Sequence, residues 1–169
     1  MTDRRGTLAL FALLALGACG TSRAPRIAGV PEPGGFEDMS CVPYARARSG
    51  LTLRGDAWQW WDAAAGRYAR TRRPQPGAVL VIGRTSRLPQ GHVAVVARVV
   101  GPREIRVDHA NWAAGAAKGR VARDQPVLDV SPGNDWSLVR VWYPRIGDYG
   151  ATAFAAHGFV GPRLAFAGG

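Results

Sequence analysis

The hydrophobic pattern of the chain changes character at the turn sequence Pro74-Gln75-Pro76-Gly77. Before this turn, apolar residues recur at helical spacing, which predicts helices over residues 41–48 and 56–68. After it, short apolar or alternating runs are typical of β-strands. We expect these strands at residues 78–82, 92–100, 105–111, 127–130 and 136–142.

Two helices followed by strands, without alternation, predict an α+β domain in which the N-terminal helices pack on an antiparallel β-sheet. The length of 169 residues suits one domain. Residues 146–169 are rich in glycine and alanine and show no pattern that assigns them to a helix or a strand. We therefore place the folded domain at residues 36–145 and a C-terminal tail at residues 146–169.

The first nineteen residues have the order of a secretory signal. Arg4 and Arg5 precede an apolar run at residues 8–16, which is too short to span a bilayer of about 30 Å, and small residues lead to Cys19. This order resembles the bacterial lipobox, in which the cysteine becomes the lipid-bearing N-terminus. A signal that is uncleaved or carries no lipid is the alternative.

The residues that follow Cys19 complete the prediction of location. Gly20 stands where the enterobacterial sorting pattern would need aspartate to retain a lipoprotein in the inner membrane. Residues 20–35, rich in proline and glycine, predict a flexible tether. We expect an exported, periplasmic protein that is lipid-anchored at the outer membrane.

The net charge of +10, from 22 Lys+Arg and 12 Asp+Glu, implies attraction to an acidic polymer or surface. Nucleic acid is a poor candidate because the arginines are scattered, no zinc-finger, helix-turn-helix or RNP pattern occurs, and export removes the usual partner. No cluster has the spacing of metal ligands, so we expect neither a metal nor a cofactor.

Cys41 is the thiol that remains if Cys19 carries lipid, in a compartment where free thiols are oxidised. Ser40 is a good N-cap, which would place Cys41 in the first turn of a helix, where the helix dipole lowers a thiol pKa. Cys41 is therefore a candidate nucleophile. The alternative is a buried small hydrophobic residue, the usual state of an unpaired cysteine.

His92 opens an apolar strand after Gly91, a residue that permits close approach to the helix carrying Cys41. His109 and Asn111 are two residues apart on the next strand and share a face, while Asp108 points the other way. We predict that His92 is the base and that His109 or Asn111 orients it, rather than Asp108. A hydrogen-bonded core histidine is the alternative for His92.

Tryptophans are candidates for lining a substrate cleft, in particular Trp60, Trp61 and Trp112. Trp60 and Trp61 are neighbours on a predicted helix, so both cannot face inward. Aromatic residues at helical spacing are more often part of the core. His157 has no partner that the sequence identifies, and we expect it in a solvated loop.

Several separated motifs occur in a fixed order along the chain: Cys41-Val42-Pro43-Tyr44-Ala45-Arg46, Gly55-Asp56-Ala57, Trp60-Trp61, Pro76-Gly77-Ala78-Val79-Leu80, Gly91-His92-Val93-Ala94-Val95-Val96 and Ala110-Asn111-Trp112. Together they resemble the CHAP domain, the cysteine- and histidine-dependent amidohydrolase/peptidase family. The resemblance covers roughly residues 36–144. It implies a papain-like α+β fold of the NlpC/P60 kind and hydrolysis of peptidoglycan amide bonds, either between N-acetylmuramic acid and L-alanine or within the stem peptide.

The resemblance assigns Cys41 as the nucleophile, His92 as the base and Asn111 as a polar residue of the site. Two positions depart from the common pattern. His109 stands where many CHAP domains have glutamate, a replacement that related NlpC/P60 enzymes also use, and Ser40 stands where glutamine is common beside the oxyanion hole. These departures keep open the alternative of a weak or inactive CHAP-like lipoprotein that binds the wall or a partner.

Overall fold

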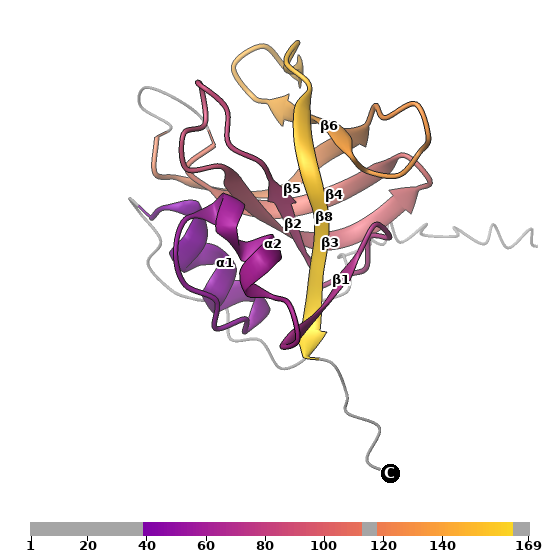
Figure 1. Ribbon diagram of the computed structural model, residues 1–169. Helices are drawn as coiled ribbons and strands as arrows, with labels where there is room; N and C mark the ends of the chain where they lie inside the picture. Colours follow the sequence, from indigo (N-terminus) through magenta and orange to yellow (C-terminus); the bar gives the residue numbers. More distant parts are fainter. Residues whose placement is uncertain (1–38, 113–117, 164–169) are drawn as a thin grey trace, which may run out of the picture.

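The computed structural model describes residues 39–112 and 118–163. Within them, two short α-helices and one 3-10 helix precede a set of eight strands (Figure 1). In chain order the elements are α1 (Cys41–Ser49), η1 (Ala57–Gln59), α2 (Trp60–Ala63), β1 (Tyr68–Thr71), β2 (Val79–Ile82), β3 (His92–Gly101), β4 (Glu104–Ala110), β5 (Val121–Asp129), β6 (Leu138–Tyr143), β7 (Asp148–Tyr149) and β8 (Phe154–Arg163).

The described strands form one antiparallel sheet that closes on itself. Their order is β1-β8-β2-β3-β4-β5-β6-β7, and β8 also pairs with β6 through Leu138 opposite Ala155 and Val139 opposite Phe154. This second pairing joins β8, β2, β3, β4, β5 and β6 into a closed barrel, with β1 and β7 as additional strands. In Figure 1, β8 runs as one long strand across the barrel.

The expected papain-like α+β fold, with helices packed on an open sheet, is therefore wrong. The protein is mainly β, and its two α-helices are short. Residues 56–68 illustrate the reason: their helical spacing is realised only over η1 and α2, after which a turn with Gly66 at φ 69° leads into β1. Residues 154–163, which lie in the unassigned C-terminal segment, supply the strand that closes the barrel.

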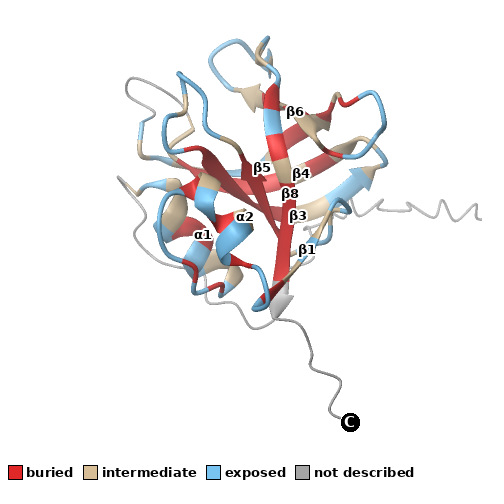
Figure 2. Cartoon of the chain, in the orientation of Figure 1, coloured by how far each residue is buried: buried red, intermediate tan, exposed pale blue. Residues whose placement is uncertain are grey.

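Alternate residues of the strands build two cores on opposite sides of the barrel wall. Ala94 and Val96 of β3 belong to the interior core, together with Ile105 and Val107 of β4. Val93, on the other face of β3, belongs to an outer core that also contains residues of α1 and α2, including Trp60. Figure 2 shows the buried residues along the central strands between these two layers. Because both faces of β2 and of the first half of β3 are covered, these strands are continuous apolar runs.

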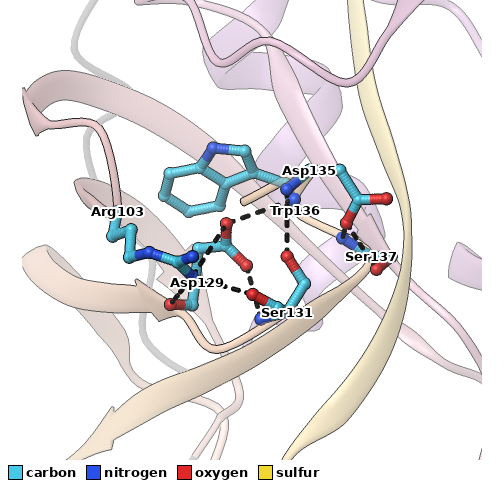
Figure 3. Close-up of polar contacts among 6 residues, drawn as sticks. All are labelled: Arg103, Asp129, Ser131, Asp135, Trp136 and Ser137. Atoms are coloured by element: carbon cyan, nitrogen blue, oxygen red, sulfur yellow. Dashed lines mark hydrogen bonds and ion pairs between the residues drawn. The ribbon is translucent and has the colours of Figure 1, made fainter. Parts of the chain in front are cut away.

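Polar contacts hold the corner between β5 and β6 (Figure 3). The buried carboxylate of Asp129 accepts the backbone N–H groups of Ser131 at 2.8 Å and Trp136 at 3.4 Å. Arg103 lies 3.8 Å from the same carboxylate and also donates to the carbonyl oxygen of Ser131 at 2.8 Å. These bonds hold the Trp136 indole in the interior core, against Phe159.

The helix predicted at residues 41–48 and the strands predicted at 78–82, 92–100, 105–111 and 136–142 are confirmed to within two residues at each end. β5 is longer than the strand predicted at 127–130. The prediction missed its first part because residues 121–126 include polar side chains and Pro126. No helix in the described ranges combines the length and the apolar character that a membrane crossing needs.

Replacing Gly158 of β8 by alanine tests the close packing of β8 against β1 and against Trp61 of α2. Its φ is +126°, and an added Cβ would lie 2.6 Å from the carbonyl oxygen of Thr71 and 2.9 Å from the Trp61 ring. We expect G158A to lower the free energy of unfolding by at least about 1 kcal/mol. The measurement is urea unfolding followed by circular dichroism.

The matched control is G101A, because Gly101 has no neighbour within 4 Å of an added Cβ and does not have a positive φ. This variant should stay within about 0.5 kcal/mol of the parent protein. Equal stabilities for the two variants would show that the close contacts of Gly158 with Thr71 and Trp61 do not limit the side chain at this position.

Candidate active site

The end of the barrel opposite Trp136 carries two buried histidines. His92 begins β3 and His109 is the penultimate residue of β4, and each shares the interior face of its strand with residues of the interior core. The side chains face each other with His92 Nε2 and His109 Nδ1 3.1 Å apart, and only 2% and 1% of the two residues are exposed. β3 and β4 thus bring His92 and His109 together, as the alternation of side chains along a strand predicts.

Trp112 covers the histidine pair. Its ring centroid lies 4.7 Å from that of His92 and 5.7 Å from that of His109, and it packs edge-to-face on Phe154 of β8 at 5.4 Å. Trp112 is half-buried and packs against the interior core. It therefore separates the histidines from solvent on one side while one part of its surface remains accessible.

Asn111 hydrogen-bonds the backbone of the β4–β5 connection, whereas His109 hydrogen-bonds His92. The φ of Asn111 is 59°, its side-chain oxygen accepts the backbone N–H of Gly119 at 2.9 Å, and its own N–H donates to the carbonyl oxygen of Arg120 at 3.0 Å. Asn111 thus shapes the connection between β4 and β5. Within the described ranges, the residue that hydrogen-bonds His92 is His109.

Cys41 is the first residue of α1, and Ser40 is the N-cap, as the sequence predicts. The Ser40 side chain makes no capping hydrogen bond. Burial raises the pKa of the half-buried Cys41 thiol, although the backbone N–H groups of Val93, Val42 and Cys41 itself oppose this by hydrogen-bonding the sulfur. The expected lowering of the thiol pKa by the helix N-terminus is therefore wrong in its net direction, because desolvation outweighs it.

Both histidines are neutral near pH 7. Burial lowers the pKa of His109 from 6.5 to about 4. Burial, reinforced by the proximity of His109, lowers the pKa of His92 well below 6.5. A protein interior disfavours the charged form of imidazole, and two imidazoles in contact disfavour it further. The resting site is consequently a neutral thiol near a neutral imidazole pair.

Asp108 points away from the histidines, as the strand alternation predicts. Its carboxylate accepts from Arg48 Nε of α1 at 3.2 Å and from the backbone N–H of Asp124 at 2.9 Å. Asp124 belongs to an irregularity of β5, where the register against β4 shifts between Val107 and His109. Asp108 therefore ties the helix that carries Cys41 to the strand that carries His109.

Gly91 fixes the start of β3. Its φ is +68°, and an added Cβ would lie 2.7 Å from the carbonyl oxygen of Ile82 and 2.9 Å from Cβ of Trp58. The close approach is thus to β2 and η1, whereas the sequence suggested the helix that carries Cys41. A side chain at this position would displace the backbone directly before His92.

Cys41, His92, Asn111 and Trp112 line one cleft of about 810 Å³ at this end of the barrel. The remaining walls are the first turns of α1, residues 55–57, residues 87–91 before β3, and Lys118. His109 lies behind His92 and is not part of the lining. The structure thus brings the candidate nucleophile and base to a common cavity that a substrate can enter.

Of the three tryptophans considered for the cleft, the structure places Trp112 there and the other two elsewhere. Trp60 is fully buried in the outer core between α2 and the barrel. Trp61 is half-buried on the outside of the barrel, with its ring 6.4 Å from that of His157 and the Arg70 guanidinium 5.2 Å from its centroid. His157 accordingly lies in β8 and not in a loop.

Sequence reasoning missed two groups of residues at the cleft. Arg87 and Lys118 stand in loops, and Phe154, which supports Trp112, lies in the unassigned C-terminal segment. Thr85 is a sequence signal for the turn at residues 85–88 that carries Arg87. The position of this turn at the same cleft as His92, however, depends on the closed barrel.

In the comparison with known families, the CHAP domain model matches residues 32–111, which include Cys41, His92, His109 and Asn111. No curated protein matches the chain. Within the described residues, no group of three or more His, Cys, Asp or Glu side chains is arranged to hold a metal ion.

The buried histidines predict a stability that depends on pH. Below pH 6.5 the unfolded chain binds protons at both histidines, whereas His109 in the native state stays neutral down to about pH 4. The unfolding free energy must therefore fall as pH drops from about 6.5 to about 4, and this contribution is fully present above pH 6.5. Urea unfolding at constant ionic strength, followed by tryptophan fluorescence, measures it.

The variant H109Q removes one of the two groups, so its unfolding free energy should depend less steeply on pH over this interval. Comparing slopes rather than absolute stabilities cancels the carboxylates common to both proteins. Identical slopes for the parent and H109Q would show that His109 is not held neutral by the fold.

Proposed function

We propose, from the match of residues 32–111 to the CHAP domain model, that the protein hydrolyses amide bonds of peptidoglycan with Cys41 as nucleophile and His92 as general base. CHAP domains are typically amidases and peptidases, which supports a hydrolase of the cell wall. The observation that supports the assignment of residues best is the shared cleft: Cys41 and His92 line it, and His109 supports His92 from behind at 3.1 Å.

The hydrogen bond between the histidines favours one direction of proton transfer. If His92 donates from Nε2 to Nδ1 of His109, its own Nδ1 is left without a proton and can accept the proton of the Cys41 thiol. His109 must be neutral to accept this bond, and its pKa of about 4 keeps it so. We assign His109 as the residue that orients His92 and stabilises the imidazolium when it forms.

Catalysis then proceeds through a covalent intermediate. The Cys41 sulfur attacks the amide carbonyl carbon as its proton passes to His92, and the C–N bond breaks as His92 returns that proton to the departing amine. Water then attacks the thioester carbonyl carbon as its proton passes to the neutral His92. The C–S bond breaks, His92 returns the proton to the Cys41 sulfur, and the carboxylic acid is released. The backbone N–H of Cys41, at the start of α1, is a donor for the oxyanion.

The raised pKa of the thiol fits this scheme, in which the thiolate forms when the substrate is bound. A neutral thiol paired with a neutral imidazole needs no preformed ion pair in a desolvated site. The proposal covers both bonds that the family suggests, the N-acetylmuramoyl-L-alanine bond and amide bonds within the stem peptide.

Replacing Cys41 tests the proposal. We expect C41A to reduce the release of soluble fragments from purified sacculi by more than about a thousandfold, because it removes the nucleophile of a unit that acts together. The loss should come without loss of fold, since Cys41 is only half-buried. Mass spectrometry of the fragments identifies the bond, and circular dichroism serves as the control for folding.

A second candidate is a CHAP domain that binds the wall without cleaving it, and the departures from the common pattern at Ser40 and His109 favour it. The two functions differ in one comparison. A parent protein that binds sacculi as well as C41A does, but releases no fragments, supports the binding module. Fragments released by the parent alone support the hydrolase.

The place of action is a further part of the proposal. Residues 1–38 lie outside the described part of the chain, so the signal sequence, the tether and the lipid site Cys19 rest on their sequence pattern. A lipid anchor followed by residues 20–35 would hold the cleft near the outer membrane, within reach of the periplasmic wall.

The variant C19S tests the anchor. With Cys19 lipidated, the full chain should partition into detergent and sediment with membranes, whereas C19S should be recovered in the soluble periplasmic fraction. Metabolic labelling with a fatty-acid probe should mark the parent protein and not C19S. Equal partitioning of the two proteins would argue against lipidation.

A further inference from the structure

The walls of the cleft carry three cations. Arg46 belongs to α1, which also provides Cys41; Arg87 belongs to the loop that leads to His92; and Lys118 follows Trp112 in the connection between β4 and β5. The segments that bring Cys41, His92 and Trp112 to the cleft thus each bring a positive charge as well. Asp56 is the only carboxylate among the described residues that line the cleft.

Among the described residues, none neutralises these three cations. Across residues 39–112 and 118–163, no carboxylate lies within ion-pair distance of Arg46, Arg87 or Lys118, although five other arginines there form such pairs. All three side chains are exposed. A positive charge without an internal partner in a cleft attracts an anionic ligand.

Arg87 is the best positioned of the three. Residues 85–88 form a turn in which Thr85 and Leu88 exchange backbone hydrogen bonds of 3.0 and 3.1 Å, and Leu88 packs against the interior core. Arg87 Nη1 donates to the neutral hydroxyl of Thr152 at 3.3 Å, which orients the guanidinium without cancelling its charge. Its other N–H groups remain available for a ligand.

We infer that the cleft recognises a substrate with a free carboxylate next to the scissile amide, bound by Arg87 with support from Arg46 and Lys118. A guanidinium binds a carboxylate through two parallel hydrogen bonds, a geometry that a carboxamide cannot match because its nitrogen is a donor. The inference rests on the proposed function and narrows its substrate: stem peptides with the free acid are preferred to their amidated forms.

The experiment compares two muropeptides that differ only in the stem glutamate, which carries either a free carboxylate or a carboxamide. The parent protein should show kcat/KM about ten- to a hundredfold higher for the carboxylate substrate, the range expected for a charge-assisted hydrogen bond. The preference should shrink as the salt concentration rises.

R87Q should lower kcat/KM for the carboxylate substrate about tenfold and leave the carboxamide substrate nearly unchanged, and R46Q should act in the same direction. The matched control is R84Q. Arg84 stands on the same loop with its guanidinium 4.8 Å from the Trp58 ring centroid, outside the cleft lining. R84Q should keep the preference of the parent protein.

Binding measurements with C41A separate this inference from the proposed function. If C41A binds the carboxylate muropeptide more tightly than the carboxamide one, the inference stands even when the parent protein cleaves neither, and the hydrolase proposal alone fails. Equal cleavage or equal binding of the two ligands, or an equal loss for both in R87Q, overturns the inference.

Discussion

The structure depends on the pairing of β8 with two strands at once. β8 lies beside β2 along one edge and reaches β6 at its first residues, Phe154 and Ala155. Without it, the sheet from β2 to β6 would have two free edges and an interior core open to water. With it, the interior becomes a closed apolar volume, and the candidate site is built at the rim of that volume.

The electrostatics of the site follow from this closure. His92 and His109 lie on the interior faces of their strands, so the same burial that completes the core removes water from both imidazoles and lowers both pKa values. Phe154 adds the surface against which Trp112 covers the pair. The charged groups Arg48 and Asp108 meet on the outer side of the wall. The barrel wall thus separates the neutral histidine pair on its inner side from the ion pair of Arg48 and Asp108 on its outer side.

The sequence was sufficient to predict the parts of this arrangement that depend on local rules. The N-cap at Ser40 places Cys41 at the start of a helix, and the two-residue period of a strand puts His109 on the face opposite to Asp108. What it could not predict depends on distant contacts. Four of the ten residues of β8 are glycine or alanine and only Val160 is β-branched, and its partners in β2 lie more than fifty residues away in the sequence.

The same distinction explains the errors at the tryptophans and at the thiol. Trp60 and Trp61 follow one another on a short helix, and only the position of the barrel determines that Trp60 is the buried one. The direction of the Cys41 pKa is likewise a matter of tertiary burial, which outweighs the local effect of the helix N-terminus.

The late position of β8 also bears on when the site can exist during synthesis. Cys41, His92 and His109 all emerge from the ribosome before Phe154, yet they gain their enclosed surroundings only after β8 has joined β2 and β6. A chain that is interrupted before this strand contains every residue of the proposed chemistry and lacks the barrel that organises it. The topology of the barrel therefore delays the assembly of the site until β8 is available to pair with β2 and β6.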